Sequence, residues 1–200
     1  KKSKVKGSKI GVSMPTKDLQ RWNQDGANMK AQLEAAGYKV DLQYAANDIP
    51  TQVSQIENMV TGKCKVLVIA AIDGSALKNP LDQAKKKGIK VIAYDRLIMN
   101  TDAVSYYATF DNYKVGTIQG EYLVDKLGLK DRTKKNPVYM ELFTGDPGDN
   151  NINFFFGGAM DILNPYIESG VIVVPSKQTS KAQCATLNWS TEEAQKRMEN

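Results

Sequence analysis

The sequence predicts an α/β protein built on doubly wound parallel sheets, because strand and helix patterns alternate along the chain. The stretch KVLVIAA, residues 65–71, is apolar on both faces, as a parallel strand covered by helices on each side must be. Apolar residues recur at helical spacing between the strand patterns, and glycines at 37, 62 and 88 end three of the expected helices. Together these patterns indicate repeated strand–helix units.

Residues 1–110 are expected to form a first lobe, and each of its elements has a local signal. The expected elements are a strand at 8–15, a helix at 18–36, a strand at 38–44, a helix from Ile49 to Val60 capped by Asp48, a strand at 65–71, a helix capped by Ser75 that ends at Gly88 and a strand at 89–94, which gives this lobe four strands.

Residues 111–200 are expected to begin a second lobe of the same kind. The expected elements are a helix at 111–128 capped by Asp111 with Val115, Ile118 and Tyr122 inward, a strand at 137–143, a helix with Phe156, Ala159, Leu163 and Ile167 on one side, a strand at 171–174 and a helix opened by a capping box of Ser190 and Glu193. Two clear strands are too few for a sheet of usual size, so this lobe is expected to be incomplete.

Composition excludes several classes of function. The chain has 200 residues, 42% of them hydrophobic, and no apolar stretch approaches the roughly 20 residues of a membrane span. It contains no histidine, which removes Ser-His-Asp and Cys-His catalysis. The net charge of +5 is matched by five lysines in KKSKVKGSK, and no basic helix interleaved with aromatic residues follows, so we expect no nucleic-acid partner. Cys64 is expected in the core, and pairing with Cys184 stays open.

Polar and aromatic residues follow the predicted strands at the edge where open parallel sheets bind ligands. They are Lys17, Asp18, Arg21, Trp22, Asp73, Asp95, Arg96, Asp146, Asp149, Asn150, Asn151, Asn188 and Trp189. Planar groups that form two hydrogen bonds, together with aromatic rings, are typical of sites for neutral sugars. MPTKDLQRW lacks the glycines of a phosphate loop, and GDPGDNN lacks the spaced acidic positions of a calcium loop, so no metal or cofactor is expected.

Each of these residues also has a purely structural interpretation. Asp95 and Arg96 could be a surface pair that ends a strand, Trp22 could be a core residue, and Asp149 could be a helix cap. A glycosidase pair of Asp95 and Asp149 is disfavoured, because carboxylates on separate lobes do not hold a fixed catalytic distance. The joint placement of these side chains after successive strands favours a binding site.

Several stretches of the chain resemble the periplasmic sugar-binding proteins of ABC transporters, in the xylose-binding and multiple-monosaccharide-binding branch. These stretches are RW at 21–22, SQIENMV at 54–60, KVLVIA at 65–70, GIKVIAYDRLI at 88–98, YYATFDN at 106–112, DNN at 149–151, LNPYIESG at 163–170 and AQKRMEN at 194–200. The resemblance implies a two-lobed type I periplasmic binding protein with a hinge crossing near residues 107–112. It also implies sugar contacts from Arg21, Asp95 and Arg96 in the first lobe and from Asp149, Asn151 and Trp189 in the second, with Trp22 as a possible stacking partner.

The expected function is therefore non-enzymatic. An extracytoplasmic receptor would capture a monosaccharide, xylose or a related aldose, and deliver it to the membrane permease of an ABC transporter. The alternative is a sugar sensor that docks on a chemoreceptor or a membrane sensor kinase. The resemblance implies a periplasmic or membrane-anchored extracellular location. Because the chain begins at Lys1 without a signal segment, we expect a mature or trimmed form, and because family members are longer, we expect part of the pocket to be absent.

Overall fold

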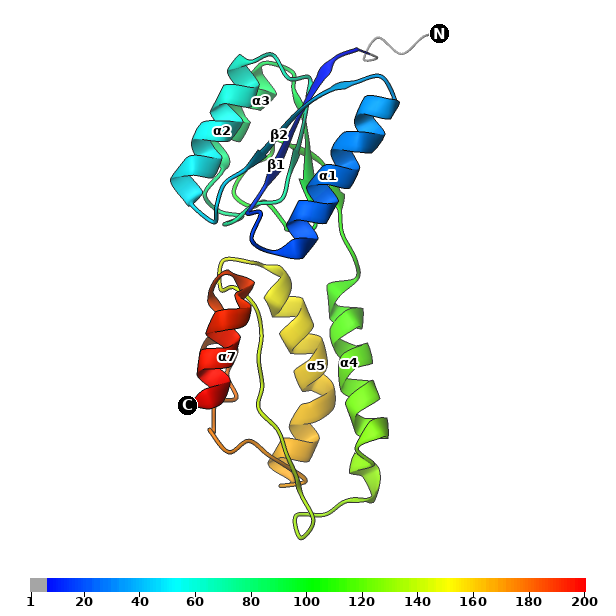
Figure 1. The fold of residues 1–200 in the computed structure, drawn as a ribbon. Coiled ribbons are helices and arrows are strands. Elements are labelled where there is room, and N and C mark those ends of the chain that lie inside the picture. Colours follow the sequence, from blue (N-terminus) through cyan, green and yellow to red (C-terminus); the bar gives the residue numbers. More distant parts are fainter. Residues whose placement is uncertain (1–6) are drawn as a thin grey trace. The chain divides into compact units, whose positions relative to one another are not determined.

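The computed structural model describes residues 7–200 and divides the chain into two compact units (Figure 1). The first unit ends at Thr109 and the second is Phe110–Asn200, so the division falls within the stretch expected to form a hinge crossing. The predicted α/β fold with parallel strands is confirmed. None of the helices in residues 7–200 has the length and apolar content that a membrane crossing demands.

A five-stranded sheet forms the centre of the first unit. Its strand order is β2-β1-β3-β4-β5, and every neighbouring pair is parallel. Because the strands are parallel, their carboxyl ends meet at one edge, which we call the carboxyl edge. The elements are β1 (Lys9–Met14), α1 (Gln20–Ala35), β2 (Lys39–Tyr44), α2 (Ile49–Thr61), β3 (Val66–Ile69), α3 (Lys78–Lys86), β4 (Lys90–Tyr94) and β5 (Val104–Ala108).

Helices cover both faces of this sheet, as its apolar central strands require. Helix α1 lies on one face, while α2 and α3 lie on the other (Figure 1). Each face has its own core cluster: Trp22 packs with β1 on the α1 side, whereas Ile56 and Leu81 pack with β3 and β4 on the other side. Cys64 is buried with the second cluster, as predicted, and both cysteines are free thiols.

The expected caps are partly wrong. Asp48 caps α2, because its Oδ2 accepts hydrogen bonds from the Thr51 backbone N–H (2.8 Å) and hydroxyl (2.5 Å). Ser75 does not cap α3. Its hydroxyl donates instead to Asp73 Oδ1 (2.6 Å), and the helix begins three residues later, after Leu77. The Asp73–Ser75 turn is the more local partnership, and it removes the hydroxyl from the helix terminus.

The second unit is built around two helices, α4 and α5, that lie side by side (Figure 1). Its elements are α4 (Asn112–Lys126), the 3₁₀ turn η1 (Leu129–Asp131), β6 (Val138–Tyr139), α5 (Asn151–Glu168), β7 (Ile172–Val173), α6 (Lys181–Cys184), the 3₁₀ turn η2 (Leu187–Trp189) and α7 (Thr191–Glu199). Strands β6 and β7 pair in parallel.

The predicted inward face of α4 is wrong. Ile118 and Tyr122 are 52% and 59% exposed, whereas Gly116 and Gly120 are buried against α5. A Cβ added at Gly116 would lie 2.3 Å from the Phe155 carbonyl oxygen, so the two backbones approach more closely than any larger residue permits. Close helix packing through glycine, rather than apolar bulk, decides which side of α4 faces inward.

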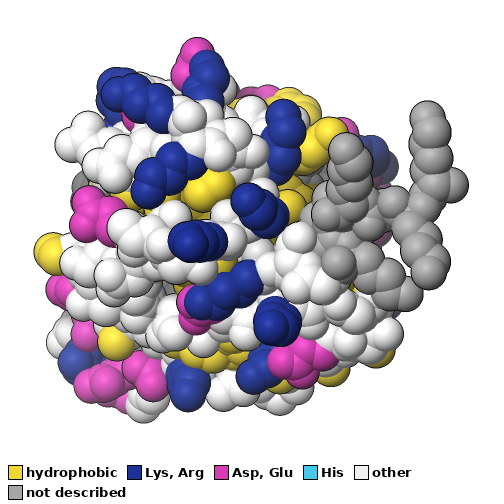
Figure 2. Space-filling model, turned by 90° about the horizontal axis from the view of Figure 1, so that it is seen from above, with side chains coloured by type: hydrophobic (Ala, Val, Ile, Leu, Met, Phe, Trp, Pro, Cys, Tyr) yellow, Lys and Arg dark blue, Asp and Glu magenta, His cyan; other side chains and the backbone are white. Residues whose placement is uncertain are grey.

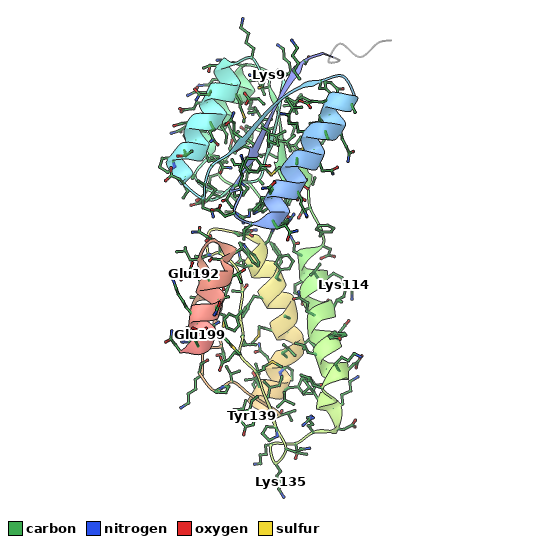
Figure 3. The ribbon with its side chains drawn as sticks, viewed as in Figure 1. Lys9, Lys114, Lys135, Tyr139, Glu192 and Glu199 are labelled. Atoms are coloured by element: carbon green, nitrogen blue, oxygen red, sulfur yellow. The ribbon has the colours of Figure 1, made fainter. Side chains whose placement is uncertain are left out.

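Two further expectations for the second unit need correction. The strand expected at 137–143 pairs only at Val138 and Tyr139, and Figure 3 shows Tyr139, 69% exposed, at this short strand. Ser190 accepts from the Glu193 backbone N–H (3.4 Å), but the complete capping box lies ten residues earlier, between Ser180 and Gln183. That capping box lies at the start of α6, a helix of four residues, which is too short to show a helical pattern of apolar residues in the sequence.

Candidate functional site

The polar cluster of the first unit is centred on Asp95, the residue that directly follows β4. Its φ of 65° lies in the left-handed region, which residues with a Cβ seldom occupy. The Arg96 backbone N–H donates to the Tyr94 carbonyl oxygen (2.7 Å), which closes a three-residue γ-turn across Asp95. A turn of this kind costs energy and persists only where its surroundings fix it.

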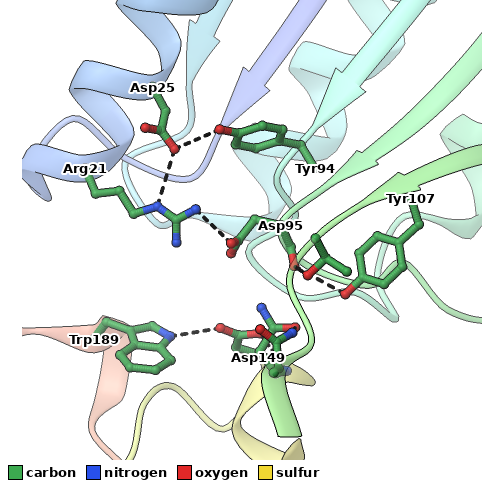
Figure 4. Close-up of polar contacts among 10 residues, drawn as sticks. Arg21, Asp25, Tyr94, Asp95, Tyr107, Asp149 and Trp189 are labelled. Atoms are coloured by element: carbon green, nitrogen blue, oxygen red, sulfur yellow. Dashed lines mark hydrogen bonds and ion pairs between the residues drawn. The ribbon is translucent and has the colours of Figure 1, made fainter. Parts of the chain in front are cut away.

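Strand β5 and the residue after it hold this turn in place. The Asp95 backbone N–H donates to the Ala108 carbonyl oxygen (2.8 Å). The Asp95 carbonyl oxygen accepts from the Thr109 hydroxyl (3.1 Å) and from the Tyr107 hydroxyl (3.3 Å). Because the backbone N–H and carbonyl group of Asp95 are both hydrogen-bonded, the turn fixes the position of the Asp95 carboxylate (Figure 4).

Arg21, in the first turn of α1, links that carboxylate to a second one. Its Nη2 donates to Asp95 Oδ1 (2.7 Å) and its Nε donates to Asp25 Oδ2 (3.3 Å), which also accepts from the Tyr94 hydroxyl (3.0 Å) (Figure 4). Burial opposes the charge of Arg21, but Asp95 and then Asp25 outweigh it, so the pKa of Arg21 is raised. Burial, followed by the bond to Asp25, raises the pKa of Tyr94. Arg21 is thus a fixed cation.

Arg96 is oriented by the backbone and by an aromatic ring. Its side chain is buried, and its Nη1 donates to the Ala71 carbonyl oxygen (3.0 Å) just beyond β3. Its guanidinium lies 5.1 Å from the centre of the Trp22 ring, and that of Arg21 lies 4.4 Å from it. Trp22 is 2% exposed, so in this structure its ring is a core residue that supports two cations.

Gln52, which the sequence reasoning missed, sets the position of the carbonyl that holds Arg96. Its amide is fully buried: Nε2 donates to Ser13 Oγ (3.1 Å) and to the Ala70 carbonyl oxygen (2.9 Å), and Oε1 accepts from the Ile72 backbone N–H (2.9 Å). The Gln52 amide therefore forms hydrogen bonds with the backbone on both sides of Ala71, at Ala70 and Ile72. A glutamine within a helix pattern carries no sequence signal for this role, because its polar character predicts exposure.

The polar cluster of the second unit is centred on Asp149, immediately before α5. Its Oδ1 accepts from the Asn151 backbone N–H (2.9 Å) and its Oδ2 accepts from the Trp189 indole N–H (3.1 Å) (Figure 4). The indole also meets Phe155 edge-on, with ring centres 6.5 Å apart. Asn112 Nδ2 donates to Asn151 Oδ1 (3.0 Å), which ties the first turns of α4 and α5 together through side chains.

The loop at 144–150 places Trp189. Asp146 Oδ2 accepts from the Asn188 backbone N–H (2.6 Å), and Gly145 accepts from the Thr186 backbone N–H (3.0 Å). A Cβ added at Gly145 would lie 2.0 Å from the indole of Trp189, so the ring lies directly on the glycine backbone. Only glycine fits beneath this ring.

Most of the residues predicted from the sequence fall into these two clusters. Asp95 forms an ion pair with Arg21 in addition to being the sequence neighbour of Arg96. Hydrogen bonds join Asp149 to Asn151 and Trp189 in the second cluster. Tyr107, Thr109 and Asn112 were not predicted as site residues, although Tyr107 lies near the carboxyl end of β5 and the other two follow it.

Each cluster is suited to binding hydroxyl groups. A carboxylate oxygen accepts up to two hydrogen bonds, so a carboxylate already oriented by the protein can accept from a ligand hydroxyl as well. Guanidinium and amide groups supply donors, and the indole supplies an apolar face. Across residues 7–200 no group of three or more Cys, Asp or Glu side chains is placed to hold a metal ion.

Comparison with known proteins gives consistent matches. A family model described as a periplasmic binding protein domain matches residues 10–200. The multiple sugar-binding periplasmic protein SbpA of Azospirillum brasilense is 56% identical over 96% of this chain and 53% of its own length. The D-xylose-binding periplasmic protein of Escherichia coli is 40% identical over 98% of this chain and 55% of its own length. The chain thus spans about half the length of these relatives.

Among solved structures, an ABC transporter solute-binding protein from Clostridium phytofermentans with bound β-D-glucose superposes with a TM-score of 0.92. It is 65% identical to this chain, and the match covers 96% of this chain and 59% of that protein. A carbohydrate transporter solute-binding protein from Chloroflexus aurantiacus, in complex with D-glucose, superposes with a TM-score of 0.74 at 37% identity.

Proposed function

We propose that this chain, which belongs to the family of periplasmic binding protein domains, functions in an extracytoplasmic receptor that captures a monosaccharide. The observation that carries the proposal is the pair of preorganised carboxylates, Asp95 and Asp149, each fixed by partners within its own unit. Oriented acceptors beside cationic donors and an indole match the alternating hydroxyl and C–H surfaces of a sugar.

In this proposal each unit supplies its own set of sugar-binding groups. Asp95, Arg21 and Arg96 bind hydroxyls from the first unit. Asp149 and Asn151 bind hydroxyls from the second, and Trp189 covers the apolar C–H face of the ring. Trp22 does not contact the sugar in this proposal; its buried ring orients the guanidinium groups of Arg21 and Arg96. The relatives named for multiple sugars and for D-xylose, and the glucose-bound structures, support an aldose.

We further propose that the receptor changes no bond in its ligand, and that it passes the sugar to the membrane permease of an ABC transporter. Membership of a binding-domain family supports both points. A location outside the cytoplasmic membrane, in the periplasm or anchored to that membrane, follows from the same role, since the relatives are periplasmic proteins.

The test is a calorimetric titration of the longer protein that contains this chain against xylose, arabinose, ribose, glucose and galactose. We expect at least one aldose to bind with micromolar affinity or better, and an aryl glycoside to remain intact during the same incubation. Absence of binding to all five sugars would contradict the receptor, and release of the aryl group would support an enzyme.

The same titration of residues 1–200 alone tests how far this chain is self-sufficient. Exposed aromatic side chains such as Tyr122 and Phe110 indicate surfaces that are uncovered here. We expect weaker binding and a larger light-scattering mass than for the longer protein. A monomer that binds with micromolar affinity would show instead that the chain is sufficient.

A further inference from the structure

Four lysines stand in a row at the edge of the first unit's sheet that lies opposite the carboxyl edge. In sheet order they are Lys39, Lys9, Lys65 and Lys90, which begin or directly precede β2, β1, β3 and β4. Lys9 and Lys39 are direct register partners, and backbone hydrogen bonds join Lys65 to both Lys9 and Lys90. We call this row the lysine edge.

Little negative charge offsets the lysine edge. Lys9 pairs with Asp41 (3.0 Å), but within residues 7–200 no ion pair to an acidic side chain is seen for Lys39, Lys65 or Lys90, all of which are exposed. Figure 2 looks onto the side of the first unit at which Figure 3 labels Lys9, and Lys and Arg side chains spread across the centre of that face, with Asp and Glu side chains mainly toward its margin. Positive charge therefore predominates at the centre of this face.

The arrangement does not serve folding. Neighbouring strands lie about 4.8 Å apart, which is inside the screening length of about 8 Å at physiological salt. Like charges on register partners destabilise a sheet. Lys39, Lys9 and Lys65 lie at one level of the sheet, whereas Lys90 is level with Val66 and therefore starts on the opposite face. Three like charges at one level, with a fourth at the next strand start, point to an anionic partner that offsets their repulsion.

We propose that the lysine edge docks on the surface of a bilayer that contains anionic phospholipid. The lysine ammonium group is a flexible point charge that can bind the diffuse negative charge of a membrane surface. Planar anions held in one orientation are bound instead through the two parallel N–H donors of an arginine guanidinium. Both arginines of the first unit, Arg21 and Arg96, belong to the carboxyl-edge cluster instead. The sequence KKSKVK, which precedes Gly7, contains four further lysines. Clustered lysines of this number favour anionic membranes.

Docking in this way leaves the candidate sugar site open. The lysine edge and the Asp95 cluster lie at opposite ends of the same parallel strands, so β4 separates Lys90 from Asp95. A receptor held by the lysine edge would present the carboxyl edge of the first unit away from the lipid surface.

Vesicle sedimentation tests the proposal directly, with vesicles of equal parts phosphatidylglycerol and phosphatidylcholine and a matched set of pure phosphatidylcholine. The triple variant Lys39→Gln, Lys65→Gln and Lys90→Gln is compared with a control triple variant of the second unit, Lys114→Gln, Lys134→Gln and Lys135→Gln. Both lower the net charge by the same amount, and all six lysines are exposed.

We expect the wild-type chain to bind only the anionic vesicles, and the lysine-edge variant to bind them about tenfold or more weakly. The control variant should retain most of the wild-type affinity. Raising the ionic strength from about 0.1 M to about 1 M should release the protein, since the screening length falls from about 10 Å to about 3 Å. The lysine-edge variant should be at least as stable to urea as the wild type, which excludes unfolding as the cause.

Three results would overturn the proposal: equal binding to pure phosphatidylcholine, wild-type affinity in the lysine-edge variant, or an equal loss in the control variant. A variant with Gln at positions 1, 2, 4 and 6 that alone abolishes binding, while the lysine-edge variant binds normally, would assign the effect to the terminal lysines. Sugar affinity should be unchanged in the lysine-edge variant, so the outcome does not depend on the proposed receptor function.

Discussion

Asp95 combines two properties that different substitutions can separate: a strained backbone and an oriented carboxylate. At a φ of 65°, alanine would carry about 1–2 kcal/mol of left-handed strain, which glycine avoids. Glycine in turn costs about 0.4–1 kcal/mol through the greater freedom of the unfolded chain. The difference predicts that Asp95→Ala is less stable than Asp95→Gly by roughly 0.5–1 kcal/mol.

The effect on sugar affinity should be the same in both variants, because both lack the carboxylate. A hydrogen bond to a charged group contributes about 1.5–3 kcal/mol, which corresponds to about a tenfold to 150-fold loss of affinity at 1.36 kcal/mol per decade. Removal of the carboxylate also takes away the Nη2 partner of Arg21, so the guanidinium keeps only the longer bond to Asp25. The loss should therefore lie toward the upper part of that range.

The assay pairs calorimetric titration with urea denaturation, in the longer protein that contains this chain. Asp95→Asn serves as the matched control, since asparagine tolerates left-handed backbone and keeps the side-chain shape while it removes the charge. Wild-type affinity in Asp95→Gly would refute the assignment of this carboxylate to the ligand. Equal stability of Asp95→Ala and Asp95→Gly would refute the argument that the turn is strained.

Three other predictions follow from single contacts. Gly145→Ala should displace the Trp189 indole and alter tryptophan fluorescence, whereas Gly157→Ala, where an added Cβ meets nothing within 4 Å, should leave it unchanged; an unchanged spectrum in Gly145→Ala would contradict the contact. Gln52→Leu should destabilise the chain by at least about 2 kcal/mol, because it leaves buried backbone groups without a hydrogen-bond partner, and it should weaken sugar binding because Ala71 no longer holds Arg96 in position. Gln55→Leu, which loses one hydrogen bond to Tyr44, should weaken sugar binding much less. Equal losses of sugar affinity in the two variants would show that Gln52 has no positioning role. The hydrogen bonds from Thr51 lower the pKa of Asp48 below its ordinary value of 3.8, so the cap stabilises the folded chain above pH 3.8 and this stabilisation is lost as the pH falls through the lowered pKa. The difference in stability between the wild type and Asp48→Asn should therefore vanish below the lowered pKa. A difference that persists in acid would refute this role of the carboxylate.

The sequence was sufficient for those parts of the fold that depend on a repeating pattern. Apolar runs such as residues 65–71 require cover on both faces, and this condition alone predicts parallel strands with helices between them. Asp48 was predictable as a cap because its partner lies three residues away. Asp95 and Arg21 were predictable as neighbours because parallel strands gather their carboxyl ends at one edge.

Contacts set by close approach could not be predicted from the sequence in the same way. The inward face of α4 depends on Gly116 and Gly120, which contribute no apolar signal, although their spacing of four residues places them on one side of a helix. The ring of Trp189 lies over Gly145, 44 residues earlier in the chain, and no local pattern links the two. The γ-turn at Asp95 likewise depends on partners in β5 rather than on its own neighbours.

The order of strands in the first unit also constrains how this protein is made. All five strands lie within one continuous stretch that ends at Ala108, and β1 gains both of its neighbours once β3 has been synthesised. Each crossover links strands that are close in sequence, so these five strands can pair once the residues up to Thr109 have been synthesised. During synthesis a contiguous unit of this kind folds before the chain that follows it.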